Sequence, residues 1–261
     1  MPPYIKYSNL IKAVFFILFS LNITQTLAKN TSDKLYFLQD YDFVYTGKLK
    51  EVISPTTFVM DDNKEYKIAY IYVDIKNYKK VISQIETLLL NKELSLYKYK
   101  ENKKDRYGRY RVIATFPSLN TNEVSYIQEE IILNGLGVLY IENGSENIIN
   151  HLKKIDQSTP INALDTNKLS KNNNSYKIVE GKVIAFKETK KSMYLNFDKD
   201  WKSDFTIRIN KNYWQNIKDS YSIDKIDDLV GKTIRIRGFI ENYYGAMINL
   251  DHKLQMDIIS E

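Results

Sequence analysis

Of the 261 residues in this chain, 43% are hydrophobic and 27% are charged, which excludes a disordered tail or a polytopic membrane protein and leaves enough apolar material for two domains. The absence of cysteine excludes disulfides, thiolate metal sites, thiol catalysis and cysteine lipidation. With only His151 and His252, histidine-rich metal sites and triad hydrolases are disfavoured. The net charge of +6 suits a nucleic-acid or anionic-lipid partner, but a general lysine bias produces the same charge.

The N-terminal segment has the pattern of a secretory signal peptide. Lys6 and Lys12 precede an apolar run over residues 13–21, and Thr26-Leu27-Ala28 resembles a small-x-small cleavage site. The run is about half of the roughly 20 apolar residues that a membrane-spanning helix needs, so an uncleaved anchor is the less favoured alternative. We expect cleavage after Ala28 of a signal peptide over residues 1–28, export to a bacterial periplasm or exterior, and no stable membrane span in the mature protein.

The first half of the chain is predicted to alternate strands with helices. Period-two alternation and β-branched or aromatic residues indicate strands, whereas apolar residues at helical spacing indicate helices. In chain order, we expect strands at 42–53, 57–60 and 65–73, a helix at 76–91, strands at 94–99 and 109–116, and helices at 122–134 and near 145–155.

Residues 156–175 are polar, rich in turn-forming residues and without periodicity, which predicts a linker. Both halves show three strands, a helix and then two or three strands, which is the order of the five-stranded OB barrel. We therefore predict a mainly β protein with helices, of the α+β class, with two OB-fold-like barrels in tandem over residues 36–155 and 176–259. The elements expected after the linker are strands at 176–187, 192–197 and 204–209, a helix at 212–220, and strands at 232–239, 246–250 and 254–258.

The most specific motif is Asp105-Arg106-Tyr107-Gly108-Arg109, which precedes a strand, and the helix after that strand ends in Leu133-Asn-Gly-Leu-Gly137. Upstream lie the segments Gly47–Phe58 and Lys67–Asp74. This order of motifs resembles the staphylococcal nuclease-like (thermonuclease) family over residues 42–141. There, a D-[KR]-Y-G-R turn follows a G-D-T turn and a metal-binding segment. The resemblance implies that the first barrel is of the staphylococcal nuclease type.

The family's phosphodiesterase chemistry needs a cation held by carboxylates, arginines against the developing charge and a group that orients water. The segment Ser54–Thr57, which matches the turn with the first metal carboxylate, contains no acid. Arg109 is the one clear match to the family's catalytic set. Lys67 matches an arginine, but an ammonium cannot make the bidentate phosphate contact of a guanidinium.

The remaining family positions depend on the register of the second segment. An ungapped match places Tyr72 on the metal aspartate and Ile75 on the water-positioning glutamate. A shift of two residues restores Asp74 as the aspartate, but then Ala69 and Asn77 stand at the arginine and glutamate positions. Either register breaks the site that the resemblance implies.

Further candidates follow from residue chemistry. Arg106 and Tyr107 lie in the same turn as Arg109 and are candidate ligand contacts. Asp61 and Asp62, with Asp74, are weak metal candidates, since adjacent acids at a hairpin tip are usually solvated turn residues.

The second half resembles a C-terminal module of some secreted bacterial thermonuclease-like proteins, through the segment Met193–Trp201 and the strand at 232–239. Trp201 is a candidate to stack on a base or sugar, with Arg235 and Arg237 facing phosphates. In the alternative, Trp201 plugs the end of the barrel and the arginines are ordinary outward residues.

Together these features favour an exported nuclease-like protein with a degenerate active site that binds single-stranded nucleic acid, another anionic ligand or a protein. One alternative is an active phosphodiesterase that uses calcium with Asp74, Asp61 or Asp105 and with Arg106 and Arg109. Another is a structural envelope protein that contacts other envelope proteins. No cofactor is expected unless the calcium-dependent alternative holds.

Overall fold

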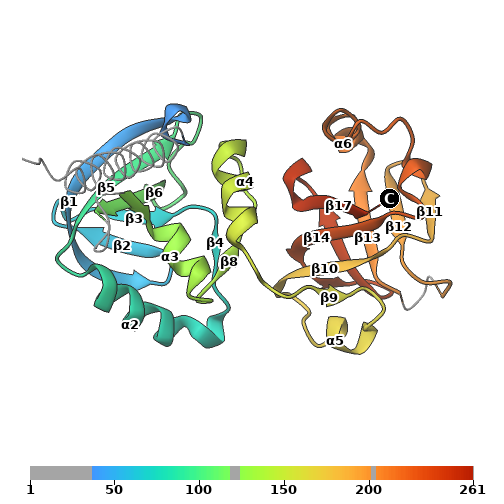
Figure 1. The fold of residues 1–261 in the computed structure, drawn as a ribbon, viewed down its shortest axis with the longest axis horizontal. Helices are drawn as coiled ribbons and strands as arrows, with labels where there is room; N and C mark the ends of the chain where they lie inside the picture. Colours follow the sequence, from blue (N-terminus) through green and yellow to red (C-terminus); the bar gives the residue numbers. More distant parts are fainter. Residues whose placement is uncertain (1–36, 118–123, 201–203, 261) are drawn as a thin grey trace, which may run out of the picture.

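The computed structural model describes residues 37–117, 124–200 and 204–260, so the expected signal peptide and Trp201 lie outside the described residues. The predicted α+β class is confirmed: most elements are strands, arranged in several sheets, with a few helices. Two lobes lie side by side, with α4 (Glu146–Ile155) between them (Figure 1). The first lobe (residues 37–155) and the second lobe (residues 161–260) have separate hydrophobic cores. No helix within these ranges is long and apolar enough to cross a membrane.

The main sheet of the first lobe closes into a ring. Its strands are β1 (Tyr41–Ser54), β2 (Thr57–Met60), β3 (Glu65–Ile68), β5 (Glu93–Tyr99) and β6 (Tyr110–Pro117), with β7 (Val124–Tyr126) added at one edge. The long strand β1 pairs antiparallel with β2 and β5, β2 pairs with β3, and β5 pairs with β6. Parallel pairing of β3 with β6 closes the ring.

Helices α2 (Tyr78–Leu89) and α3 (Ile127–Leu133) pack on this ring through apolar faces, and β4 (Ile71–Tyr72) pairs with β8 (Val138–Leu139). The expected strand at 65–73 is interrupted at Tyr70, whose φ of 63° is left-handed. The Tyr70 N–H donates to Glu142 Oε1 at 2.9 Å, and its hydroxyl meets that of Tyr41 at 2.7 Å. These distant contacts hold a conformation that a β-branched and aromatic sequence does not reveal.

The second lobe contains two sheets, with strand orders β17-β14-β10-β9 and β11-β12-β13-β16-β15. In the latter, β12 pairs antiparallel with β11 and β13, and β13 runs parallel to β16. The elements are β9 (Ile161–Asn162), α5 (Thr166–Ser170), β10 (Tyr176–Lys182), β11 (Ala185–Glu188), β12 (Ser192–Asn196), β13 (Thr206–Asn210), α6 (Trp214–Tyr221), β14 (Thr233–Phe239), β15 (Glu241–Asn242), β16 (Ala246–Leu250) and β17 (Met256–Ser260).

The stretch expected to be a linker, residues 156–175, contains β9 and α5. Ile161 and Leu169 are buried in the second core, and β9 pairs parallel with β10. Elements of two and five residues are too short to show a period, so composition alone gives them the signature of a loop.

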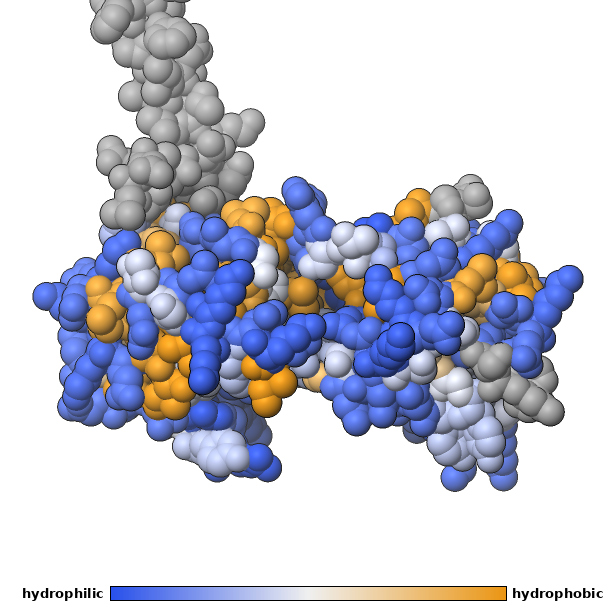
Figure 2. Space-filling view, turned by 90° about the horizontal axis from the view of Figure 1, so that it is seen from below, coloured by the Kyte–Doolittle hydropathy of each residue, from blue (hydrophilic) through white to orange (hydrophobic). Residues whose placement is uncertain are grey.

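The lobes are joined by an aromatic cluster and by ion pairs of Asp74 with Lys177 and of Lys153 with Asp257. Tyr72 and Tyr140 of the first lobe contact Tyr176 and Phe239 of the second, with ring centroids 5.2–6.3 Å apart. Seen from below, the lobes meet at a narrower waist, and most residues on this face are hydrophilic (Figure 2). The aromatic contacts make the junction a packed interface.

Candidate functional site

The Asp105–Arg109 turn is held together by its own acidic residue. The Asp105 carboxylate accepts hydrogen bonds from the Tyr107 N–H at 2.9 Å, the Arg109 N–H at 3.0 Å and Arg109 Nε at 2.9 Å. Gly108 has a φ of 78°, which a residue with a side chain rarely adopts. The turn is therefore built around an internal Asp–Arg pair.

Burial raises the pKa of the Asp105 carboxyl, but its hydrogen bonds from Arg109 and Tyr107 outweigh this, so the pKa is lowered. We expect Asp105→Ala to lower the free energy of unfolding at neutral pH by about 2 kcal/mol. Because the folded-state pKa lies below the unfolded value of about 3.9, this contribution is complete above that pH and is lost as the pH falls through the folded pKa.

Urea unfolding across this pH range measures the effect, with Asp251→Ala as the control, since Asp251 is exposed and its carboxylate has no partner among the described residues. A deficit in Asp105→Ala that stays constant through the acidic range would contradict this origin.

Two carboxylates converge on Arg109, and both pair with its guanidinium. Asp105 Oδ2 lies 2.9 Å from Nη2, Glu65 Oε2 lies 3.6 Å from Nη1, and the Thr57 hydroxyl also lies 3.5 Å from Nη1. The Arg109 side chain is 17% exposed. An arginine held by two acids is poorly available to a phosphate.

Lys67 lies between Thr57 and Arg111 in the cross-strand register. Arg111 pairs with Glu142 at 2.7 Å, whereas Lys67 has no ion-pair or hydrogen-bond partner for its ammonium in the described ranges. This surface thus combines three cations with three acids. The cations are Lys67, Arg109 and Arg111, and the acids are Glu65, Asp105 and Glu142. Since these charges balance, we do not expect the surface around Arg109 to concentrate anions.

The positions that would have to hold calcium in the nuclease alternative make other contacts. Tyr72 lies in the aromatic cluster between the lobes. Asp74 caps a short turn at Lys76 and forms ion pairs with Lys76 at 3.4 Å and Lys177 at 3.7 Å. Asp61 accepts from the Tyr45 hydroxyl, and Asp62 from the Tyr66 hydroxyl, each at 2.9 Å. No three His, Asp or Glu side chains form a possible metal group in the described part of the chain.

The other sequence candidates are scattered over both lobes. Tyr107 is 63% exposed, and the guanidinium carbons of Arg106 and Arg109 lie 4.7 and 4.8 Å from its ring centroid. Arg235 pairs with Glu180 across neighbouring strands, at 2.6 Å. The Arg237 side chain is only 3% exposed and pairs with Asp156, so it does not face an open surface.

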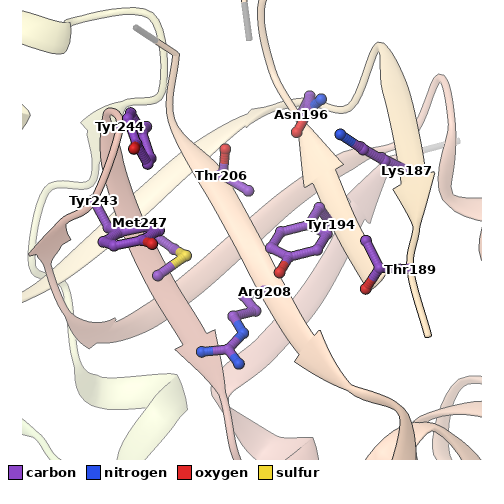
Figure 3. A pocket seen from close by; sticks show the side chains of 9 residues that line it. All are labelled: Lys187, Thr189, Tyr194, Asn196, Thr206, Arg208, Tyr243, Tyr244 and Met247. Carbon is purple, nitrogen blue, oxygen red and sulfur yellow. The ribbon is translucent and has the colours of Figure 1, made fainter. Parts of the chain in front are cut away.

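A cavity of about 480 Å³ lies on the sheet of the second lobe that contains β12 and β13 (Figure 3). Cross-strand pairing places the side chains in two adjacent rows, Lys187–Tyr194–Arg208 and Asn196–Thr206–Met247. Alternate residues of these strands, such as Leu195 and Ile207, point into the core. The cavity is lined by Lys187, Thr189, Tyr194, Asn196, Thr206, Arg208, Tyr243, Tyr244 and Met247.

Tyr243 and Tyr244 overhang this cavity from the tip of the β15–β16 hairpin. They are 71% and 78% exposed, and their rings lie 5.0 Å apart at 80°. Solvent-exposed rings at a hairpin tip bury no core surface, so they are available to a ligand.

The described residues that line the cavity include two cationic side chains, Lys187 and Arg208. Arg208 Nε donates to the Ser192 hydroxyl at 3.3 Å, and its guanidinium has no carboxylate partner within the described ranges. No acid is among the described residues that line the cavity. The arrangement suits a ligand that combines negative charge with flat rings.

Sequence reasoning missed this cavity and pointed to Trp201, Arg235 and Arg237 instead. The alternation in Ser192–Asn196 and Thr206–Asn210 contains the necessary signal, because it places Tyr194, Asn196 and Arg208 opposite the buried residues. The pairing that adds the tyrosine hairpin beside them is long-range and leaves no local signal. No known protein family matches this chain, and no curated protein matches it either.

Proposed function

We propose that this is an exported, nuclease-like protein that binds single-stranded nucleic acid through the cavity of the second lobe and does not hydrolyse it. The observation that carries the proposal is the combination of Lys187 and Arg208 with three tyrosines, in a cavity without an acid among its described lining residues. Proteins that bind single strands combine cations that follow the phosphates with aromatic rings on which bases stack.

Strand order supports OB-type barrels in both lobes. The ring of the first lobe has the order β1-β2-β3-β6-β5, with β3 and β6 parallel. In the second lobe, β10 and β11 together act as the first strand, pairing with β14 and β12 respectively, and β13 and β16 form the parallel pair. An OB barrel binds oligonucleotides on its second and third strands and on the loops beside them. Here β12 and β13 hold the cavity, and the β11–β12 and β15–β16 loops flank it.

The first lobe supports loss of hydrolysis. A phosphodiesterase transition state needs cationic groups free to meet the developing charge. Arg109 is held by Asp105 and Glu65, and Asp74 is held by two lysines. Tyr72, at a metal position of the family that the chain resembles, packs against the second lobe.

The purified protein, mixed with a single-stranded octathymidylate and calcium, tests both parts. We expect saturable binding and no shortening of the oligonucleotide. The binding should weaken as salt rises, because the protein's cationic side chains displace counterions from the phosphates. Fluorescence anisotropy measures the binding and gel electrophoresis measures the length. Degradation in calcium that is absent in Arg109→Ala would contradict the loss of hydrolysis, and no binding at low salt would contradict the binding function.

A further inference from the structure

We propose that the cavity of the second lobe distinguishes among the four bases through the side-chain amide of Asn196. This inference rests on the proposed nucleic-acid binding and adds to it a preference among the four bases. Binding through stacking and charge alone tolerates any base, since every base has an aromatic face. The distinguishing feature is therefore a polar group that can recognise the edge of a base.

Asn196 is the one amide among the described residues that line the cavity, and the two threonine hydroxyls near it already make hydrogen bonds within the protein. The Thr206 hydroxyl donates to Asp204 at 3.1 Å, and the Thr189 hydroxyl donates to the Ser192 carbonyl at 2.8 Å. By contrast, the Asn196 amide has no hydrogen-bond partner in the part of the chain that the structure describes. An amide offers both a donor and an acceptor, the arrangement that proteins use for bidentate contact with a base edge.

The strand register places a stacking ring and a cation beside this amide. Tyr194 lies two residues before Asn196 on the same face of β12, and Arg208 is the cross-strand partner of Tyr194. A base in contact with Asn196 therefore lies beside the Tyr194 ring, with its phosphate toward Arg208. Figure 3 shows Tyr194, Asn196 and Arg208 around the same space, with Lys187 on the neighbouring strand β11.

The cavity is large enough for a base together with its sugar and phosphate. Its volume of about 480 Å³ lies within the range for pockets that hold a small organic ligand. The Tyr243 and Tyr244 rings are nearly perpendicular, at 80°, so they do not extend one continuous stack of parallel bases. A base held beside an amide that has no other hydrogen-bond partner is the geometry in which base identity affects affinity.

The test uses octamers of abasic nucleotides that carry one central adenine, cytosine, guanine or thymine, with binding measured by fluorescence anisotropy. We expect the affinities of the wild-type protein to differ by about tenfold or more between the best and worst base, since a bidentate pair discriminates by factors of this size. Asn196→Ala should bring the four affinities to within about twofold by weakening the best ligand. Arg208→Ala should weaken all four about equally and preserve the differences, because a phosphate contact carries no base information.

The outcomes separate this inference from the proposed function. Equal affinity for all four octamers, weakened by Arg208→Ala, overturns base recognition and leaves nucleic-acid binding intact. Differences that persist in Asn196→Ala overturn the role of Asn196. No binding of any octamer, nor of octathymidylate, overturns both proposals. An unchanged urea midpoint of Asn196→Ala shows that the variant folds, and Asn196→Asp, which keeps the shape but loses the donors, should change which base is preferred.

Discussion

The double variant Tyr243→Ala/Tyr244→Ala will bind octathymidylate about tenfold more weakly than the wild-type protein, because stacking on an aromatic ring contributes about 1–3 kcal/mol per base. Both rings are exposed at a hairpin tip, so their removal takes almost no packing from the core. The loss will therefore appear in binding and not in the stability of the free protein. Fluorescence anisotropy measures the affinity, and a urea titration checks the fold.

Tyr107→Ala is the matched control for this double variant. Tyr107 is 63% exposed, also lies beside arginine, and belongs to the turn that resembles a nuclease motif in the first lobe. We expect its replacement to change affinity by less than about twofold, since the positive and negative side chains around Arg109 balance. Equal losses in the two proteins would show that the hairpin is not a special binding surface.

Arg237→Ala will destabilise the protein more than any other single change to its charged residues discussed above. The Asp156 side chain is 1% exposed and its carboxylate lies 3.3 Å from Arg237 Nη1. Removing the arginine leaves a buried carboxylate with hydrogen bonds from Leu139 and Ser158 but without its countercharge. Breaking one partner of a buried ion pair costs about 3–5 kcal/mol, which we expect as the loss in the free energy of unfolding.

Two further variants isolate the buried charge as the cause. Arg235→Ala removes an arginine two residues earlier, whose pair with Glu180 is about one-third exposed, and should cost below about 1 kcal/mol. Asp156→Asn/Arg237→Met removes both charges and should recover much of the stability that Arg237→Ala loses. If Arg235→Ala and Arg237→Ala unfold at the same urea concentration, the buried pair of Arg237 with Asp156 does not stabilise the protein.

Much of the fold was accessible from the sequence because it depends on local periodicity. The expected helix at 76–91 corresponds to α2, and the expected strands at 57–60 and 246–250 correspond to β2 and β16. Closure of the ring was not accessible, since the β3–β6 pairing joins residues far apart in sequence. The turn at Tyr70 was hidden for the same reason, because the contacts that hold it come from Glu142 and Tyr41.

The site was harder to predict than the fold because charges act through partners. Arg109 was found from its motif, but its commitment to Glu65 depends on a neighbouring strand. Arg237 was a candidate to face phosphates, but no local pattern reveals its partner Asp156, which lies 81 residues away. Conversely, Arg208 lies in no recognisable sequence motif. Only the strand register shows that it shares a cavity with Tyr194.

Binding of octathymidylate by Arg208→Ala and by Arg109→Ala, compared at one salt concentration, locates the ligand on the protein. Each variant loses one positive charge, so a difference between them reports where the ligand lies. We predict that Arg208→Ala weakens binding about tenfold, because charge-assisted contacts contribute about 1.5–3 kcal/mol, and that Arg109→Ala retains nearly the wild-type affinity. The reverse order, with Arg109→Ala weakened and Arg208→Ala unchanged, would place the ligand on the first lobe beside Arg109 and contradict binding in the cavity of the second lobe.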